Sequence, residues 1–190
     1  MNAVPLFPLF LKLAGRRVVV VGGGTIAAGK VGGLLRAEAL VTVVAPEIQS
    51  GLAILGVLIK RKKFEPSDLD GAWLAIAAAP PEVNRQVAAA ADQRHVFVNA
   101  VDDPTAASAL TGGVLTKGGA TVAISTGGQA PALAGLLREA LELLLPWDLE
   151  TWVAEARSLR EKWKAEGVPM KRRRPLLLKA LNQLYDEAQP

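Results

Sequence analysis

The chain has no cysteine and only one histidine, His95. Without cysteine it can form neither disulfides nor the thiolate sites that hold zinc or iron–sulfur clusters. A single histidine also excludes a zinc site built from several histidines of one chain. We therefore expect no metal-binding residues in the chain itself.

Long apolar runs are absent as well. No run reaches the roughly 18 residues that a membrane-spanning helix needs, although 51% of the residues are hydrophobic. The opening stretch, MNAVPLFPLFLKL, has no early basic region and no small-residue cleavage site, so we expect no signal peptide. The sequence predicts a cytoplasmic protein without a membrane partner, with one domain of ordinary size and a smaller appendage in its 190 residues.

The net charge is a modest +4, but the positive residues are clustered. The two basic runs are KRKK at 60–63 and KRRR at 171–174. They are either a solvated strand edge and a loop between helices, or a surface that attracts a polyanionic ligand. Because no aromatic residues alternate with the basic ones, as binding of single-stranded nucleic acid would require, we expect no nucleic-acid partner.

A glycine-rich stretch from Val18 to Ala28, VVVVGGGTIAA, carries a recognisable motif. Four valines run into three glycines and a helix start, an order that lets backbone N–H groups at a helix N-terminus face an anion. Gly22, Gly24 and Ala27 occupy the three positions of G-x-G-x-x-G/A, the dinucleotide-binding fingerprint. The competing interpretation is a glycine turn that serves only tight packing of a strand against a helix.

Apolar strand patterns alternate with helical patterns through the first half of the chain. Strands are predicted over 17–21, 40–44, 57–60, 73–78 and 96–99, and helices over 25–39, 48–55 and 82–92. This alternation predicts a Rossmann-type α/β fold with a doubly wound parallel sheet and right-handed crossovers. After residue 104 we expect a hairpin over 114–117 and 121–125, a helix that starts at Pro131 and ends at Pro146, and two amphipathic helices.

Ligands of a parallel sheet bind beyond the carboxyl ends of its strands, where this chain has few reactive residues. Only Asn99, Asp102 and Asp103 at that edge could move a proton or bind an ion, and two acids before a proline are also common turn formers. Glu47, after the second strand, is either the ligand of the adenosine ribose or an ordinary acid at a helix N-terminus. The stretch STGG at 125–128 is either an anion-binding lead into the next helix or a cap.

Five motifs occur in an order that is typical of one known family. They are LFPLFLKLAGRRVVVVGGG, VTVVAPE, AWLAIAAAPPEVNRQVA, VNAVDDP and VAISTGGQAPALAGLLREALELLLP. Through them, residues 5–146 of the chain resemble the precorrin-2 dehydrogenase family, the NAD-binding part of siroheme synthase. The resemblance implies oxidation of precorrin-2 to sirohydrochlorin with NAD⁺, in some members also insertion of Fe²⁺ to make siroheme, and a homodimer whose clefts take residues from both chains.

The resemblance also implies roles for individual residues. NAD would be bound by Gly22, Gly23, Gly24, Thr25, Ile26, Pro46, Glu47 and Ala78. Asp102 would be the catalytic base that removes a proton from the substrate, and in bifunctional members it also serves chelation. The tetrapyrrole, precorrin-2 or sirohydrochlorin, would be bound by Asn99, Asp103, Ser125, Thr126 and Gly127.

Three places depart from the family pattern. The family usually has Thr-Asp-Asp where this chain has Ala79-Pro80-Pro81, and it has an aromatic residue and a proline where this chain reads ALTGG at 109–113. Glu38 stands where the family has a glycine near the end of the first helix.

The expected domains are an NAD-binding Rossmann domain at 1–112, a dimerisation segment of hairpin plus helix at 113–146, and a C-terminal helical domain at 147–190. The basic runs agree with the expected substrate, because precorrin-2 carries many carboxylates that a basic cleft would attract. The alternative function, from another class, is a non-catalytic protein that binds NAD or a tetrapyrrole, such as a sensor or a carrier.

Overall fold

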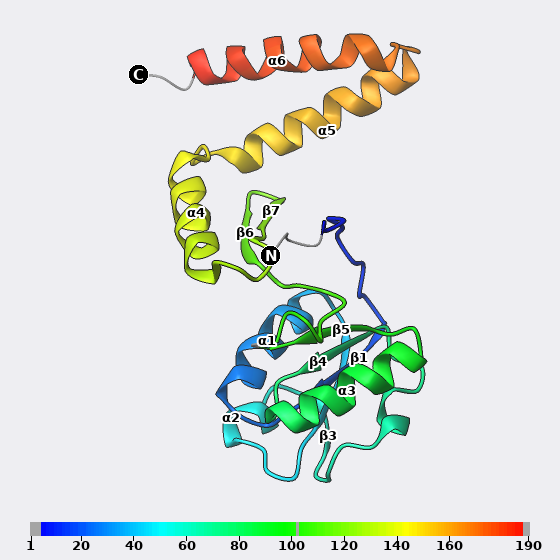
Figure 1. The fold of residues 1–190 in the computed structure, drawn as a ribbon. Coiled ribbons are helices and arrows are strands. Elements are labelled where there is room, and N and C mark those ends of the chain that lie inside the picture. Colours follow the sequence, from blue (N-terminus) through cyan, green and yellow to red (C-terminus); the bar gives the residue numbers. More distant parts are fainter. Residues whose placement is uncertain (1–4, 102, 188–190) are drawn as a thin grey trace. The chain divides into compact units, whose positions relative to one another are not determined.

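A computed structural model describes residues 5–101 and 103–187 of the chain. It divides into two compact units, which Figure 1 draws with their helices and strands labelled. The sheet unit comprises Met1–Thr111 and Gly127–Gln129, and the helical unit comprises Gly112–Thr126 and Ala130–Pro190. The division of the second unit into a dimerisation segment and a separate helical domain stays a prediction.

The sheet unit is built on five parallel strands in the order β3-β2-β1-β4-β5. The strands are β1 (Arg17–Val21), β2 (Leu40–Val44), β3 (Leu58–Lys60), β4 (Leu74–Ala77) and β5 (Phe97–Ala100). Val21 is in register with Val44 of β2 on one side and with Ala77 of β4 on the other, so these three strands end at the same edge. Because the chain leaves β1 toward β2 and later returns to the other side of β1 as β4, that edge contains the topological switch point.

Helices cover both faces of this sheet, which explains why its central strands are mostly apolar. One face, with Val18 and Val20, packs against α1 (Thr25–Arg36) and α2 (Ser50–Ala53). The other face, with Val19 and Val21, packs against α3 (Pro81–Gln93) and the short 3₁₀ helix η1 (Pro66–Leu69). The predicted Rossmann-type fold is confirmed.

The first helix ends earlier than the sequence pattern predicted. It stops at Arg36, and Glu38 takes a left-handed backbone conformation with φ of 57° before β2 begins. Glu38 is the residue that replaces the family's glycine, and a glycine would adopt this φ without the steric cost that a Cβ brings. Glu38 therefore lies at the amino ends of the strands, on the opposite edge of the sheet from the glycine loop.

The helical unit begins with an antiparallel hairpin of β6 (Gly113–Lys117) and β7 (Ala120–Ile124). Gly118 and Gly119 join the strands, both with positive φ, as the tight turns of two-residue hairpins require. The helices that follow are α4 (Pro131–Leu144), α5 (Leu149–Ala165) and α6 (Met170–Glu187). The predicted loop at 171–174 is wrong, because these basic residues lie in the first turns of α6. Across the described part of the chain, no helix is long and apolar enough to cross a membrane.

Candidate dinucleotide-binding site

A cavity of about 860 Å³ lies at the carboxyl edge of the sheet, where β1, β2 and β4 end. Seven of the eight residues predicted to bind NAD line it: Gly22, Gly23, Gly24, Ile26, Pro46, Glu47 and Ala78. The eighth, Thr25, lies in the same loop, and its Oγ1 accepts a hydrogen bond from Gln49 Nε2 at 3.2 Å. The structure thus gathers residues from three strand ends around one space, and their binding of NAD stays a prediction.

The three glycines of the loop meet two different spatial demands. A Cβ at Gly22, whose φ is 129°, would lie 2.1 Å from the Ala78 carbonyl oxygen, and one at Gly23 would lie 2.0 Å from the Glu47 carbonyl oxygen. A Cβ at Gly24 would meet nothing within 4 Å. The first two glycines therefore serve packing within the chain, whereas the third leaves open the space beside the helix N-terminus.

That open space is suited to a pyrophosphate. Gly24 is the N-cap residue of α1 and offers no side chain to the first N–H groups of the helix. The first intrahelical bond runs from Ala28 N–H to the Gly24 carbonyl oxygen at 3.0 Å, so the N–H groups before Ala28 have no partner within the helix. The helix dipole adds partial positive charge at this end. The residues present therefore fit the phosphates of a dinucleotide.

Glu47 belongs to the wall of the cavity rather than to a helix. The chain after β2 crosses over the glycine loop, where Gln49 N–H donates to the Gly23 carbonyl oxygen at 2.9 Å. Helix α2 begins only at Ser50, so Glu47 is not an acid of its first turn. The side chain of Glu47 is exposed and lines the cavity. This geometry favours the ribose-ligand interpretation over the ordinary helix acid.

Sequence reasoning missed several residues that shape the cavity. Asn84 is only 5% exposed, and its Oδ1 accepts a hydrogen bond from Ala79 N–H at 3.0 Å, which holds the loop after β4. The sequence signal that could have indicated this role is the spacing of Asn84, which lies three residues before Val87 and therefore on the same packing face of α3. Other lining residues that were missed are Lys63, Phe64, Glu82, Val83 and Gln86.

Two of the four residues of the KRKK run are occupied by structural ion pairs. Asp68 is 2% exposed, and its carboxylate accepts from Lys60 Nζ and Lys62 Nζ, both at 3.1 Å. Burial alone would raise the pKa of Asp68, but the hydrogen bonds from Glu65 N–H, Lys62 and Lys60 outweigh it and hold this pKa below its usual value. The run is thus neither a plain solvated edge nor a uniform anion-binding surface.

Asp102, the predicted catalytic base, lies outside the described residues. Its neighbour Asp103 is a turn former, since its Oδ1 accepts from Thr105 N–H, Thr105 Oγ1 and Ala106 N–H. The Thr105 hydroxyl and the Ala106 N–H lower the pKa of Asp103, which keeps that carboxyl ionised. Among the described residues, no three acids or histidines gather closely enough to hold a metal ion.

Asn99 is buried, 6% exposed, at the end of β5. Its Nδ2 donates to the Ala109 carbonyl oxygen at 2.9 Å, and its Oδ1 accepts from Thr111 Oγ1 at 3.4 Å. Lys30 of α1 in turn donates to Thr111 Oγ1 at 2.8 Å. Asn99 therefore ties the ALTGG segment to the sheet, and substrate binding by it stays a prediction.

Within the sheet unit, Gly128 of the STGG stretch lies against Pro104, the proline that ends VDDP. Gly128 has φ of 79°, and a Cβ there would lie 2.8 Å from Cγ of Pro104. Within the helical unit, Thr126 Oγ1 accepts the N–H of Ala130, the N-cap residue of α4, at 3.1 Å. Thr126 thus holds the backbone just before α4 but does not cap the helix, because this bond uses the N–H of the N-cap residue and not one of the first turn.

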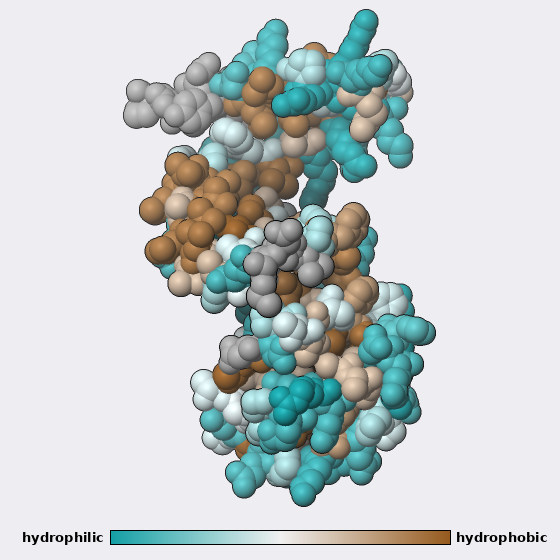
Figure 2. Space-filling model, in the orientation of Figure 1, coloured by the Kyte–Doolittle hydropathy of each residue, from teal (hydrophilic) through white to brown (hydrophobic). Residues whose placement is uncertain are grey.

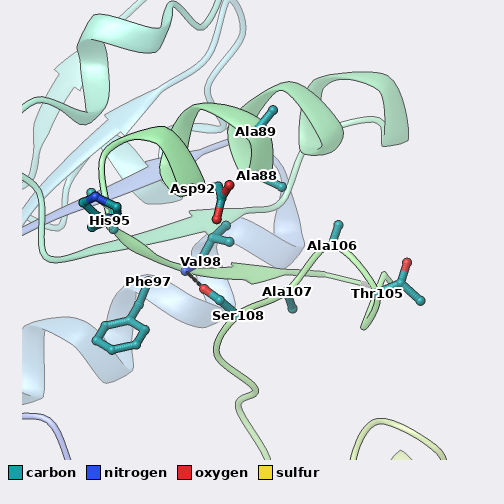
Figure 3. Close-up of a pocket in the computed structure, with 11 residues that line it drawn as sticks. Ala88, Ala89, Asp92, His95, Phe97, Val98, Thr105, Ala106, Ala107 and Ser108 are labelled. Carbon is teal, nitrogen blue, oxygen red and sulfur yellow. Dashed lines mark hydrogen bonds between the residues drawn. The ribbon is translucent and has the colours of Figure 1, made fainter. Parts of the chain in front are cut away.

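A second hollow, of about 610 Å³, lies along β5 and α3, away from the glycine loop. Figure 3 shows its lining, in which four alanines and Val98 are joined by Asp92, His95, Phe97, Thr105 and Ser108. Ser108 Oγ accepts the N–H of Val98 at 2.9 Å, and so occupies one donor of this edge strand. The fingerprint residues do not line this hollow, and we place the dinucleotide in the first cavity.

Comparison with known proteins agrees with the geometry. Residues 9–113 match a family described as "Putative NAD(P)-binding", and residues 118–143 match one described as "Sirohaem biosynthesis protein central". The chain is 44% identical over 172 residues to siroheme synthase 3 of Aeromonas hydrophila subsp. hydrophila, covering 88% of this chain and 37% of that protein. It is 43% identical over 180 residues to siroheme synthase of Photorhabdus laumondii subsp. laumondii, covering 92% of this chain and 38% of that protein.

The chain therefore spans well under half the length of these relatives. A solved structure described as SirC, precorrin-2 dehydrogenase, has a more similar length. It superposes with a TM-score of 0.69 at 26% identity, over 92% of this chain and 88% of that one. The resemblance drawn from the sequence motifs is confirmed: the chain belongs to the NAD(P)-binding family, and it is similar to siroheme synthases and to a precorrin-2 dehydrogenase.

Proposed function

We propose that the chain oxidises precorrin-2 to sirohydrochlorin, with NAD⁺ as the oxidant. The observation that carries this proposal is the likeness to SirC, precorrin-2 dehydrogenase, over 92% of this chain. The siroheme synthases point to the same biosynthesis, and the cavity at the glycine loop fits a dinucleotide.

The proposed reaction removes two hydrogens from precorrin-2, one as a hydride and one as a proton. NAD⁺ held at the glycine loop supplies the hydride acceptor. The N–H groups at the start of α1 hold its phosphates, and Glu47 holds its adenosine ribose. Asp102 takes the proton, and Ser125, Thr126 and Gly127 contact the tetrapyrrole.

Within this proposal, Asn99 and Asp103 also belong to the tetrapyrrole site. Each already has hydrogen-bond partners in the chain, Asn99 with the 109–111 segment and Asp103 with the turn at 105–106. These hydrogen bonds hold parts of the chain that follows β5. Asp102 lies between β5 and that turn in the sequence.

The test mixes the protein with NAD⁺ and precorrin-2 and follows NADH absorbance together with the spectrum of sirohydrochlorin. The proposal predicts that both rise together and above the enzyme-free rate. Binding of NAD⁺ and precorrin-2 without any product would instead make the chain a sensor or carrier. The absence of binding to either molecule would remove both functions.

We also propose that the chain forms a homodimer through α4. Figure 2 shows apolar side chains gathered over this helix, where a soluble monomer would normally expose polar residues. The exposed large residues of α4 and of the turn that follows it are Leu133, Leu136, Leu137, Leu143, Leu144 and Trp147. A second copy would remove this surface from water and gain the corresponding hydrophobic free energy.

Light scattering on the native chain tests the dimer. Leu136→Asp, at a position 63% exposed, should shift the mass from dimer toward monomer. Leu40→Asp, at a position 61% exposed on β2, is the matched control and should leave the mass unchanged. A monomeric native chain, or a dimer that Leu136→Asp leaves intact, would contradict the proposal.

Insertion of Fe²⁺ into sirohydrochlorin is a further proposed activity, supported by the name siroheme synthase that the relatives carry. Fe²⁺ would be a substrate here, and Asp102 is the residue we propose to assist the step. To test this activity, sirohydrochlorin and Fe²⁺ are mixed with and without the protein, and siroheme formation is followed by its absorption spectrum. Equal rates in the two samples would exclude chelatase activity.

A further inference from the structure

Lys63 is a basic residue in the wall of the dinucleotide cavity. It follows β3 and lines the same space as Gly24 and Glu47. Ala45 N–H donates to the Lys60 carbonyl oxygen at 3.2 Å, so the chain after β2 and the chain after β3 leave the sheet side by side. Lys63 thus faces the region beyond the end of β2, where a Rossmann fold binds the adenosine ribose.

Lys63 differs from the lysines beside it, which are held by ion pairs with described residues. Lys60 and Lys62 are held by Asp68, and Lys62 also pairs with Glu65 at 2.8 Å. Within residues 5–101 and 103–187, Lys63 makes neither a hydrogen bond nor an ion pair, and its side chain is exposed. Its ammonium group is therefore available to a ligand in the cavity.

The end of β2 lacks the feature that excludes NADP⁺ from an NAD-specific fold. Such folds place an acid at the strand end, where its charge accepts from the ribose 2′-hydroxyl and repels a 2′-phosphate. In this chain the strand is followed by buried Ala45, and the acid comes two residues later as Glu47. Glu47 and Lys63 therefore bring opposite charges to the same cavity, from the segments that follow two neighbouring strands.

We propose that Lys63 binds the 2′-phosphate of NADP⁺, so that the cavity accepts NADP⁺ as well as NAD⁺. The proposal rests on the proposed dinucleotide site at Gly22–Gly24 and adds the recognition of its adenosine end. Glu47 favours the free 2′-hydroxyl of NAD⁺, and Lys63 favours the phosphorylated ribose. Because both side chains are exposed, the attraction to the phosphate weakens as salt is added.

Isothermal titration of the full chain with NAD⁺, NADP⁺, 2′-AMP and 5′-AMP tests the proposal without any turnover. Lys63→Ala should raise Kd for NADP⁺ and for 2′-AMP by about tenfold, because one charge-assisted hydrogen bond is lost. Kd for NAD⁺ and for 5′-AMP should change by less than about threefold. Glu47→Gln should strengthen the binding of NADP⁺ relative to that of NAD⁺. Arg61→Ala is the matched control, since it removes one charge from the same exposed run outside the cavity lining.

Three results would overturn the inference. One is a native chain that binds NADP⁺ more than about a hundredfold more weakly than NAD⁺. Another is a ratio of Kd for NADP⁺ to Kd for NAD⁺ that Lys63→Ala leaves unchanged, or that Arg61→Ala changes by the same factor. The third is the absence of binding to both dinucleotides, which would remove the proposed cofactor site itself, whereas the first two would leave that site in place.

Discussion

Gly24→Ser separates folding from dinucleotide binding at the glycine loop. A Cβ at Gly24 meets no atom within 4 Å, so the substitution should not disturb the packing of the chain. Gly24 is also the N-cap residue of α1, a position where serine is at least as favourable as glycine, by a few tenths of a kcal/mol. We therefore expect the melting temperature to stay the same or to rise slightly.

The same substitution should weaken NAD⁺ binding. The serine side chain fills the space beside the helix N-terminus, and its hydroxyl accepts the N–H groups that the pyrophosphate would otherwise use. A hydrogen bond to a charged group contributes about 1.5–3 kcal/mol, so the loss of one raises Kd by about ten- to a hundredfold. Isothermal titration with NAD⁺ measures Kd, and thermal unfolding measures stability.

Gly23→Ser supplies the contrast. Its Cβ would lie 2.0 Å from the Glu47 carbonyl oxygen. Such overpacking lowers the free energy of unfolding by about 1–3 kcal/mol, which corresponds to a fall of about 2–12 °C in the melting temperature of a chain of this size. Gly23→Ser should therefore lower the melting temperature, whereas Gly24→Ser should not. If Gly24→Ser kept the native melting temperature and bound NAD⁺ as tightly as the native chain, the loop would not be the pyrophosphate site.

Three further substitutions test the surrounding structure. Glu38→Gly should stabilise the fold by about 1 kcal/mol in chemical unfolding, because φ of 57° strains any residue with a Cβ, and Glu38→Ala should give no such gain. Because the pKa of Asp68 is lowered in the folded chain, its contribution to stability is complete above its ordinary pKa of about 4 and is lost as the pH falls through the lowered value. Asp68→Asn should therefore flatten the pH dependence of the free energy of unfolding in that acid range. An unchanged pH dependence would contradict the ion pairs. Asn84→Ala should cost about 1–3 kcal/mol by leaving Ala79 N–H without its acceptor, and a neutral result would show that this hydrogen bond does not hold the loop.

The sequence was sufficient to predict the sheet unit because its signals are local. Four consecutive valines indicate a strand buried on both faces, and the glycines that follow indicate a tight turn into a helix. The hairpin was equally predictable from Gly118-Gly119 between two short apolar runs. Each of these features depends on residues that are neighbours in the chain.

Features that depend on which partner a side chain meets in the folded chain were not predictable in the same way. The partition of the KRKK run follows from Asp68, which reaches Lys60 and Lys62 only after the chain has turned through η1. The role of Asn84 likewise depends on the loop at Ala79, because an asparagine in a helix does not reveal whether its side chain meets solvent or a backbone N–H. The first basic run therefore looked uniform in the sequence and is divided in the structure.

The central claim is that the glycine loop holds NAD⁺ while Asp102 carries the proton transfer in the oxidation of precorrin-2. The most direct test is a single-turnover reaction with NAD⁺ and precorrin-2, run in parallel on the native chain and on Asp102→Asn, with Kd for NAD⁺ measured on both. We predict one NADH for each precorrin-2 consumed by the native chain, and no NADH from Asp102→Asn at an unchanged Kd. NADH formation by Asp102→Asn at the native rate, or no NADH from a native chain that binds both molecules, would contradict the account.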